Sequence, residues 1–199
     1  MKEVFRRFER AFVRTVIIIY CKILYRVKVI GTENIPKDGA VIYCGNHRNY
    51  VDPQLIVVTA KRHVRFIAKE ELTQTPALRV LGNVFDAIYV KRNSKDITAL
   101  KEALKTLKQG NCVALFPEGT RNGLEKGEQV KEGAAFFAVR TGAKVLPVGI
   151  SGGDKIFKKA IVKYGKPLDF SEYKGKAQNK EVLEKVTDEI MSNIIELTK

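Results

Sequence analysis

The chain has 199 residues, of which 45% are hydrophobic and 29% are charged, a composition typical of one globular domain with its own core. Lys and Arg number 36 against 22 Asp and Glu, and the net charge of +14 predicts an anionic partner: nucleic acid, an anionic membrane surface or a phosphorylated substrate. Cys21, Cys44 and Cys112 are widely spaced in apolar runs. This spacing argues against a disulfide framework or a zinc cluster, so buried thiols in a reducing, cytosolic compartment are the default expectation.

The first predicted element is a basic amphipathic helix over residues 1–26. Arg14 and Lys22 bracket only seven uncharged residues, too few for a spanning helix, which needs about 20 mostly apolar residues; no signal-peptide cleavage site is present either. Its apolar face comprises Phe5, Phe8, Phe12, Val16, Ile19 and Ile23. Its basic stripe comprises Arg7, Arg10 and Arg14. Such a helix is expected to lie in the interface of an anionic bilayer; the alternative is a helix packed on its own domain.

Residues 27–199 are predicted to form one α/β domain, because short apolar strands alternate with helices. Strands are expected at 26–31, 39–45, 63–69, 85–92, 112–119, 144–150 and 160–170. Helices are expected from residue 53 to about 60, at 94–110, 131–142 and 179–197, with a helical or irregular piece at 70–82. The pattern is typical of a largely parallel or mixed sheet flanked by helices. Polar segments follow four of the strands, so they are expected to converge at the carboxyl edge of the sheet.

The segment VIYCGNHRNYVDP, residues 41–53, contains His47 and, five residues later, Asp52. In a loop that enters a helix at Pro53, the chain can fold back so that Asp52 accepts a hydrogen bond from one imidazole nitrogen. The other nitrogen is then free to act as a base. The alternative is that Asp52 only begins a helix before proline. The second histidine, His63, is interpreted as structural or on the surface.

A second polar segment, FPEGTRN at residues 116–122, follows a predicted buried strand. Gly119 permits a tight turn, and Arg121 is suited to bind a phosphate through two parallel hydrogen bonds, with backbone amides as further donors. Lys91 and Arg92 follow another predicted strand and are also suited to an anion. The plainer alternatives are a charged turn with a Glu–Arg ion pair and a solvated basic surface.

The His-x4-Asp pair, the Lys-Arg pair, FPEGTR and VLPVGI (residues 145–150) occur in this order and closely resemble the motifs of the glycerolipid acyltransferase family, in particular the lysophosphatidate (1-acylglycerol-3-phosphate) acyltransferases. The resemblance implies that His47 is the general base and Asp52 its partner. The residues it implies for the glycerol-phosphate site are Lys91, Arg92, Glu118, Gly119, Thr120 and Arg121. Those it implies for the acyl-donor side are Val145, Pro147, Val148 and Gly149. Asn49 and Asn122 stand where the family commonly has serine, which leaves substrate preference open.

The implied activity is transfer of a fatty acyl group from acyl-CoA or acyl carrier protein to the sn-2 hydroxyl of lysophosphatidate, which gives phosphatidate for phospholipid biosynthesis. A thioester is already activated, so no metal, other cofactor or covalent intermediate is expected. The expected location is the cytoplasmic face of the cell membrane, with the protein peripheral or monotopic on anionic lipid.

Three alternatives to this function remain. The acceptor could be glycerol-3-phosphate or another lysophospholipid. A non-catalytic basic lipid- or nucleic-acid-binding module would explain the charge but would leave the His-Asp pair and the FPEGTR turn without a purpose. Nucleic acid is not expected as a partner, because interleaved aromatic and basic motifs are missing. A serine or cysteine hydrolase is disfavoured, because Cys44 ends an apolar strand and the sequence has no Gly-x-Ser-x-Gly motif.

Overall fold

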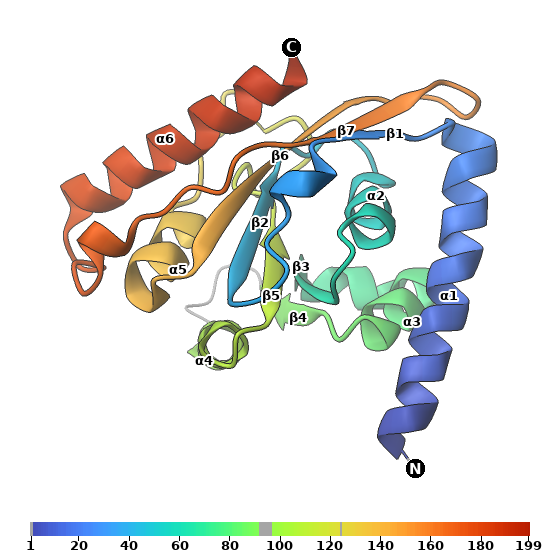
Figure 1. Ribbon diagram of the computed structural model, residues 1–199, viewed down its shortest axis with the longest axis horizontal. Coiled ribbons are helices and arrows are strands. Elements are labelled where there is room, and N and C mark those ends of the chain that lie inside the picture. Colours follow the sequence, from blue (N-terminus) through green and yellow to red (C-terminus); the bar gives the residue numbers. More distant parts are fainter. Residues whose placement is uncertain (1, 92–96, 124) are drawn as a thin grey trace.

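Within residues 2–91, 97–123 and 125–199, which the computed structural model describes, the chain forms a seven-stranded sheet (Figure 1). The strands are β1 (Lys28–Ile30), β2 (Val41–Gly45), β3 (Val64–Lys69), β4 (Ile88–Val90), β5 (Cys112–Leu115), β6 (Lys144–Gly152) and β7 (Ala160–Tyr164). Their order across the sheet is β1-β7-β6-β2-β5-β3-β4. Each strand coincides with a predicted one, and the predicted α/β fold is confirmed.

Five strands of this sheet run in one direction. β2 pairs in parallel with β5 and β6, and β3 pairs in parallel with β4 and β5. β7 is antiparallel to β6 and parallel to β1, so the sheet is mixed. The carboxyl ends of β2 to β6 therefore lie at one edge, where open α/β sheets bind their ligands.

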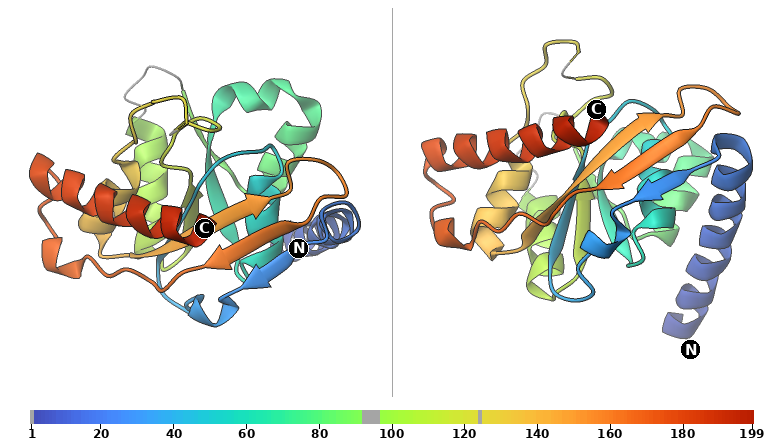
Figure 2. Two further views of the ribbon diagram at one scale, coloured as in Figure 1. Left: turned by 90° about the horizontal axis from the view of Figure 1, so that it is seen from above. Right: turned by 45° about the horizontal axis from the view of Figure 1, so that its top comes forward.

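Helices cover both faces of the sheet. They are α1 (Lys2–Tyr25), α2 (Asp52–Thr59), α3 (Pro76–Val84), α4 (Ile97–Lys108), α5 (Gly133–Thr141) and α6 (Lys180–Thr198), with 3-10 helices at Thr32–Asn34, Glu70–Gln74 and Ser171–Tyr173. α1, α2 and α3 lie on one side of the sheet and α4, α5 and α6 on the other (Figure 2). Because successive strand side chains point to opposite faces, Tyr43 of β2 packs in the core cluster with α2, and Ile42 packs in the cluster with α4, α5 and α6.

Residue types at the helix ends explain where these helices stop and start. Gly110 (φ +76°) follows α4 and Gly142 (φ +73°) follows α5, which is the left-handed conformation that glycine adopts without a Cβ penalty. At the start of α6, the side chain of Asn179 accepts a hydrogen bond from Val182 N at 3.2 Å. The predicted N-cap of α4, Ser94, lies outside the described residues.

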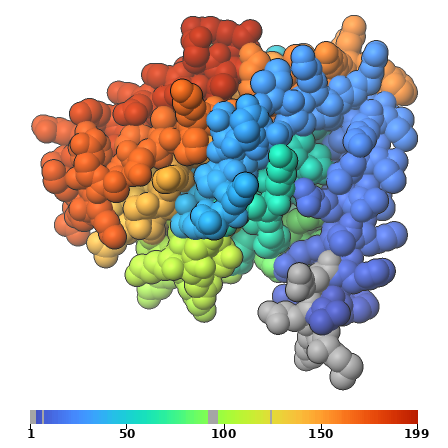
Figure 3. Space-filling view, viewed as in Figure 1, coloured from blue at the N-terminus to red at the C-terminus, as the bar shows by residue number. Residues whose placement is uncertain are grey.

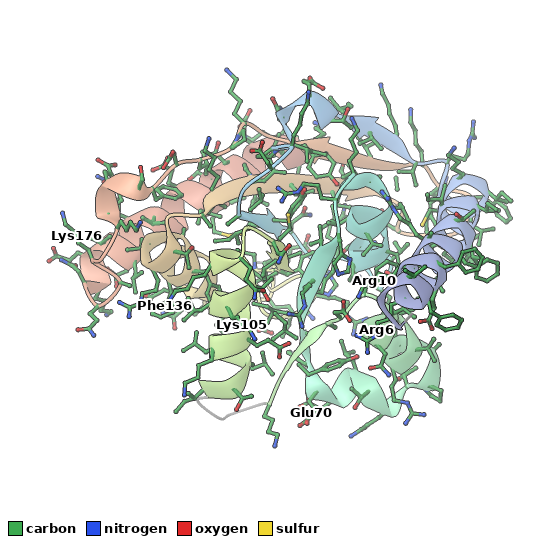
Figure 4. All side chains as sticks on the ribbon, turned by 60° about the horizontal axis from the view of Figure 1, so that its bottom comes forward. Arg6, Arg10, Glu70, Lys105, Phe136 and Lys176 are labelled. Carbon is green, nitrogen blue, oxygen red and sulfur yellow. The ribbon has the colours of Figure 1, made fainter. Side chains whose placement is uncertain are left out.

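α1 packs on the protein through one face only. Ile17 and Cys21 are buried in the core cluster beside α2. Arg10 donates from Nε to Val84 O at 2.9 Å, and both Arg6 and Arg10 form ion pairs with Asp86. Figure 4 shows both arginines on the side of α1 that faces the rest of the molecule. Part of the basic stripe is therefore used to attach the helix.

The opposite face of α1 is the predicted apolar face, and it is exposed. Its residues range from 49% to 71% exposed and are Phe5, Phe8, Phe12, Val16, Ile19 and Ile23. In the space-filling view α1 forms one flank of the molecule (Figure 3). Among the described residues, no helix is long and apolar enough to cross a bilayer. The helix therefore packs on its domain, as one of the two predicted alternatives has it, and leaves an apolar stripe open; its place in a bilayer interface stays a prediction.

Candidate active site

We call residues 46–52 the His47 loop; it connects β2 to α2 at the carboxyl edge of the sheet. His47 Nδ1 lies 3.0 Å from Asp52 Oδ2. The His47 side chain is 19% exposed and that of Asp52 only 1%. With Asp52 as acceptor, Nδ1 carries the proton and Nε2 of the neutral ring is left as a base.

The His47 loop folds back because Asp52 binds its backbone. Besides the imidazole, Oδ2 of Asp52 accepts hydrogen bonds from Arg48 N at 2.6 Å and Asn49 N at 2.7 Å. Asp52 is also the first residue of α2, with Pro53 after it, so its negative charge lies at the helix end that favours anions. Both sequence interpretations of Asp52 therefore describe the structure: it begins the helix, and it orients His47.

The segment after β5, residues 116–123, contacts both the ring and the backbone of His47; we call it the Phe116 turn. The rings of His47 and Phe116 are stacked, with centroids 4.2 Å apart. Glu118 Oε1 accepts from His47 N at 3.0 Å, and Asn122 N donates to His47 O at 2.6 Å. The backbone on both sides of His47 is thereby fixed by one turn.

The position of Phe116 defines the side of the sheet on which the imidazole lies. Phe116 packs against the core cluster that α1 and α2 share, and its ring is 5.9 Å from that of Phe66. The imidazole stacked on it is therefore on the same side of the sheet as α1, the helix with the exposed apolar face.

Arg121 reaches across to the His47 loop. Its guanidinium carbon is 3.5 Å from the ring centroid of Tyr50, a cation–π contact. Among the described residues, no carboxylate forms an ion pair with Arg121, so its charge is available to an anionic ligand. The tight turn that presents it depends on Gly119, whose φ is +69°.

The other predicted residues of this segment have distinct surroundings. Glu118 is buried, at 4% exposed, and its hydrogen bond from His47 N supports the His47 loop; its role at the glycerol-phosphate site stays a prediction. Thr120 Oγ1 and Asn122 Oδ1 are buried and have no hydrogen-bond partner among the described atoms. Buried polar atoms without partners cost free energy, so these two are candidates for contact with a bound substrate.

The predicted Lys-Arg pair is only partly described. Lys91 follows β4 and is exposed at the same edge of the sheet, but β3 lies between β4 and β5. Arg92 lies outside the described residues. The structure thus brings together the segments after β2 and β5 and leaves Lys91 two strands away from the Phe116 turn.

The predicted acyl-donor residues belong to the interior of β6. Val145 and Val148 are fully buried, one on each side of the sheet. At Gly149 a Cβ would lie 2.4 Å from Cβ of Leu197, so the absence of a side chain lets α6 pack closely on β6. Pro147 O accepts from Gly165 N at 2.9 Å. These contacts show a packing role, and the role of the four residues towards an acyl donor stays a prediction.

Asn46 is a residue of this region that the sequence did not reveal. It is 7% exposed, and its amide donates to Ile150 O at 2.8 Å and accepts from Ile150 N at 2.7 Å. The paired bonds tie the start of the His47 loop to β6. In the sequence, the only sign of this role is that an asparagine directly precedes the histidine. Its partner, Ile150, is 104 residues away, so no local pattern indicates the contact.

A cavity of about 230 Å³ lies beside the His47 loop. Asn46 and Arg48 line it from that loop, and Ile194 and Thr198 line it from α6. His47 is not among its lining residues. Glu118 and Asn122 of the Phe116 turn also line the cavity, so it adjoins the residues that support His47, and we assign the chemistry to the imidazole.

The cysteines and the second histidine have surroundings that differ from those of His47. Cys44 is fully buried in β2, and burial raises the pKa of its thiol far above the usual value, which disfavours a cysteine hydrolase. Cys21 and Cys112 are likewise buried and free. Within the described part of the chain, no group of three His, Cys, Asp or Glu side chains is placed to hold a metal ion. His63, predicted to be structural or on the surface, is 37% exposed and its Nε2 lies 3.4 Å from Asp86 Oδ2.

Known proteins resemble this chain in sequence and in fold. A 1-acyl-sn-glycerol-3-phosphate acyltransferase from Borreliella burgdorferi is 34% identical over 139 residues, which cover 69% of this chain and 56% of that protein. A protein of the same name from Bacillus subtilis is 30% identical over 177 residues, or 86% of this chain and 87% of that protein. The crystal structure of the 1-acyl-sn-glycerophosphate acyltransferase from Thermotoga maritima superimposes with a TM-score of 0.68 at 30% identity, over 96% of this chain and 82% of that one.

The extent of these matches differs. This chain spans about half the length of the Borreliella relative and most of the Bacillus relative. A family model described as Acyltransferase matches residues 26–151, which is more than half of the chain and includes the His47 loop, the Phe116 turn and all but the last residue of β6. The chain therefore belongs to this acyltransferase family.

Proposed function

We propose that the protein transfers a fatty acyl group from a thioester to the sn-2 hydroxyl of lysophosphatidate and so makes phosphatidate for phospholipid biosynthesis. The observation that carries the proposal is the His47 Nδ1 to Asp52 Oδ2 pair, held next to an arginine without a carboxylate partner among the described residues. Relatives named for this reaction support the choice of acceptor.

In the proposed mechanism His47 is the general base. Nε2 takes the proton of the acceptor hydroxyl while that oxygen attacks the thioester carbonyl, and Asp52 stabilises the imidazolium that forms. This attack forms the C–O bond of the new ester and gives a tetrahedral intermediate. Collapse of the intermediate restores the carbonyl and breaks the C–S bond. The proton on Nε2 then passes to the departing thiolate. The thioester is already activated, so the proposal needs neither a metal nor a covalent acyl-enzyme.

Arg121 is proposed to bind the phosphate of the acceptor. Its guanidinium lies over Tyr50 of the His47 loop, so a phosphate on it would bring the glycerol hydroxyls towards the imidazole. Thr120 and Asn122 are proposed to complete the polar contacts, because each has a buried oxygen without a partner among the described atoms. Lys91 and Arg92 are proposed to add positive charge at the same edge.

The proposed location is the cytoplasmic face of the cell membrane, with the protein peripheral or monotopic. The support is the exposed apolar face of α1, the net charge of +14 and the position of the imidazole on the side of the sheet where α1 lies. A lipid acceptor and a long-chain acyl-CoA both partition into bilayers, so a site beside a bilayer-bound helix would meet both.

The test is acyl transfer by the purified chain. Lysophosphatidate, glycerol-3-phosphate and other lysophospholipids are each offered with acyl-CoA or with acyl carrier protein thioester, and free thiol and lipid product are measured. We expect phosphatidate with one or both donors and at least a thousandfold lower kcat for His47→Ala. If no acceptor gives thiol release, the proposed function is overturned. Substantial turnover by His47→Ala would overturn the role of His47 as the base.

A further inference from the structure

The connection between β6 and β7, residues 153–159, carries exposed apolar side chains; we call it the β6–β7 tip. Ile156 is 53% exposed and Phe157 is 68% exposed. Lys155, Lys158 and Lys159 flank them and are exposed as well. Exposed aromatic and aliphatic side chains set among lysines are typical of a segment that enters the headgroup region of an anionic bilayer.

The backbone holds Phe157 in this exposed position. Its φ is +67°, a conformation that bulky residues rarely adopt. Its N–H donates to Leu24 O in the last turn of α1 at 2.6 Å, and the N–H of Lys158 donates to Lys155 O at 3.1 Å. The tip is thus an ordered turn attached to α1, and its apolar side chains are outside because of that turn.

The β6–β7 tip brings its exposed apolar side chains to the carboxyl end of α1. Figures 1 and 2 show the tip beside the carboxyl end of α1. Near that end, Ile19 is 52% and Ile23 is 62% exposed, and Lys22 and Arg26 are exposed. One surface made from two distant parts of the chain therefore joins apolar side chains with positive charge.

The base of the tip is also attached to the His47 loop. Asp154 Oδ1 is 3.2 Å from Arg48 Nη2 and accepts from Asn49 Nδ2 at 3.4 Å. Asn49 also binds Asp52 through its backbone N–H. The tip is thereby tied at one end to α1 and at the other to the loop that orients His47.

We propose that Ile156 and Phe157 insert into an anionic bilayer as a second anchor beside α1, and that this anchor sets the orientation of the His47 loop relative to the lipid surface. The inference rests on the proposed function, because it assumes that the acceptor lies in a bilayer. One helix on a surface still allows the protein to rock about the helix axis, and a second point of contact away from that axis restrains this motion. An acidic protein carrier would also meet the lysines, but the apolar pair and its continuity with α1 favour lipid.

The chain has no tryptophan, so Phe157→Trp makes a single fluorescent reporter at the tip. The matched control is Ile97→Trp, because Ile97 is 60% exposed at the start of α4 on the other side of the sheet. With vesicles containing phosphatidylglycerol, we expect a blue-shifted emission for Phe157→Trp that brominated lipids quench, and no change for Ile97→Trp. Unchanged Phe157→Trp emission with vesicles, or a shift produced only by acyl carrier protein, would overturn the proposal.

The second experiment measures function and lipid binding on the double variant Ile156→Ser/Phe157→Ser. Vesicle affinity should fall about tenfold for each apolar side chain lost. Turnover of lysophosphatidate in vesicles should fall with it, while turnover of a monomeric short-chain lysophosphatidate should stay unchanged. Equal vesicle affinity and equal turnover in variant and wild type would contradict the anchor. If the wild type turns over neither acceptor, the proposed function fails, and the emission and affinity measurements still decide the anchor.

Discussion

Asp52 of the His47 loop and the phenylalanines of α1 have opposite surroundings. Asp52 is 1% exposed, and its Oδ2 binds one imidazole nitrogen and two backbone N–H groups. Phe5 and Phe8 are each 71% exposed. A buried carboxylate without partners is costly, and so is a continuous apolar stripe in water. The protein supplies the partners of the carboxylate itself, whereas the stripe needs a partner from outside the chain.

Among the variants that compare these two regions, the largest effect is expected for Asp52→Asn. An asparagine carries no charge and has an N–H donor in place of one carboxylate oxygen, so the hydrogen bonds to the His47 loop weaken and the imidazole loses its counter-charge. We expect kcat to fall roughly 10²- to 10⁴-fold, measured by thiol release, while binding to anionic vesicles stays unchanged. Equal losses of activity and of vesicle binding would show that the two regions are not separate.

The second effect is on α1 and concerns the double variant Phe8→Ser/Phe12→Ser. Vesicle affinity should fall about a hundredfold, or about tenfold for each phenylalanine removed from the bilayer, as measured by co-sedimentation. Turnover of a monomeric acceptor should remain, because these side chains make no part of the His47 loop. A matched control is Ile17→Val on the buried face of α1, which should lower stability and leave vesicle affinity unchanged.

A smaller effect is expected for Arg121→Gln. Loss of a charged hydrogen bond to the phosphate should raise KM for lysophosphatidate about tenfold or more, with a smaller change in kcat. Arg121→Lys should restore only part of the affinity, because a lysine cannot form two parallel hydrogen bonds. A kcat loss without a change in KM would show that Arg121 does not bind the acceptor in the ground state.

The smallest effect concerns the pH dependence of folding stability near Asp86. This residue binds Arg6 and Arg10 of α1 and also lies beside His63. Burial, together with Arg10 on α1 and Arg65 on β3, lowers the pKa of His63 below 6.5 despite the attraction of Asp86. The unfolded chain therefore binds this proton more readily than the folded one, and stability should decrease as pH falls below about 6.5. Tm is measured by thermal unfolding at pH about 7.5 and at pH about 5.5. The decrease in Tm between these two pH values should be a few degrees smaller in His63→Gln than in the wild type. Equal losses would exclude His63 as the source.

Much of the molecule could be predicted from the sequence because the relevant signals are local. Apolar runs ended by glycine or polar residues predicted every strand of the described sheet, and the 3.6-residue periodicity of α1 predicted the face that is now seen to be exposed. The pairing of His47 with Asp52 was predictable because only five residues separate them and Pro53 begins a helix after them.

Contacts between distant residues could not be predicted in this way. Asn46 binds Ile150 across 104 positions, and Glu118 binds His47 N across 71. The tip meets Leu24 of α1 only because β6 and β7 form a hairpin that ends beside that helix. No local pattern encodes such pairs, since they depend on the order of strands in the sheet.

The sequence by itself determined the elements, the class of fold and the identity of the candidate dyad, because propensity, periodicity and short spacing act within a few residues. Only the tertiary structure decided which face of α1 is buried, which residues hold His47 in place and which surface joins the helix to the β6–β7 tip. The physical reason is that burial and hydrogen bonding depend on what lies opposite each side chain, and that is set by packing across the sheet.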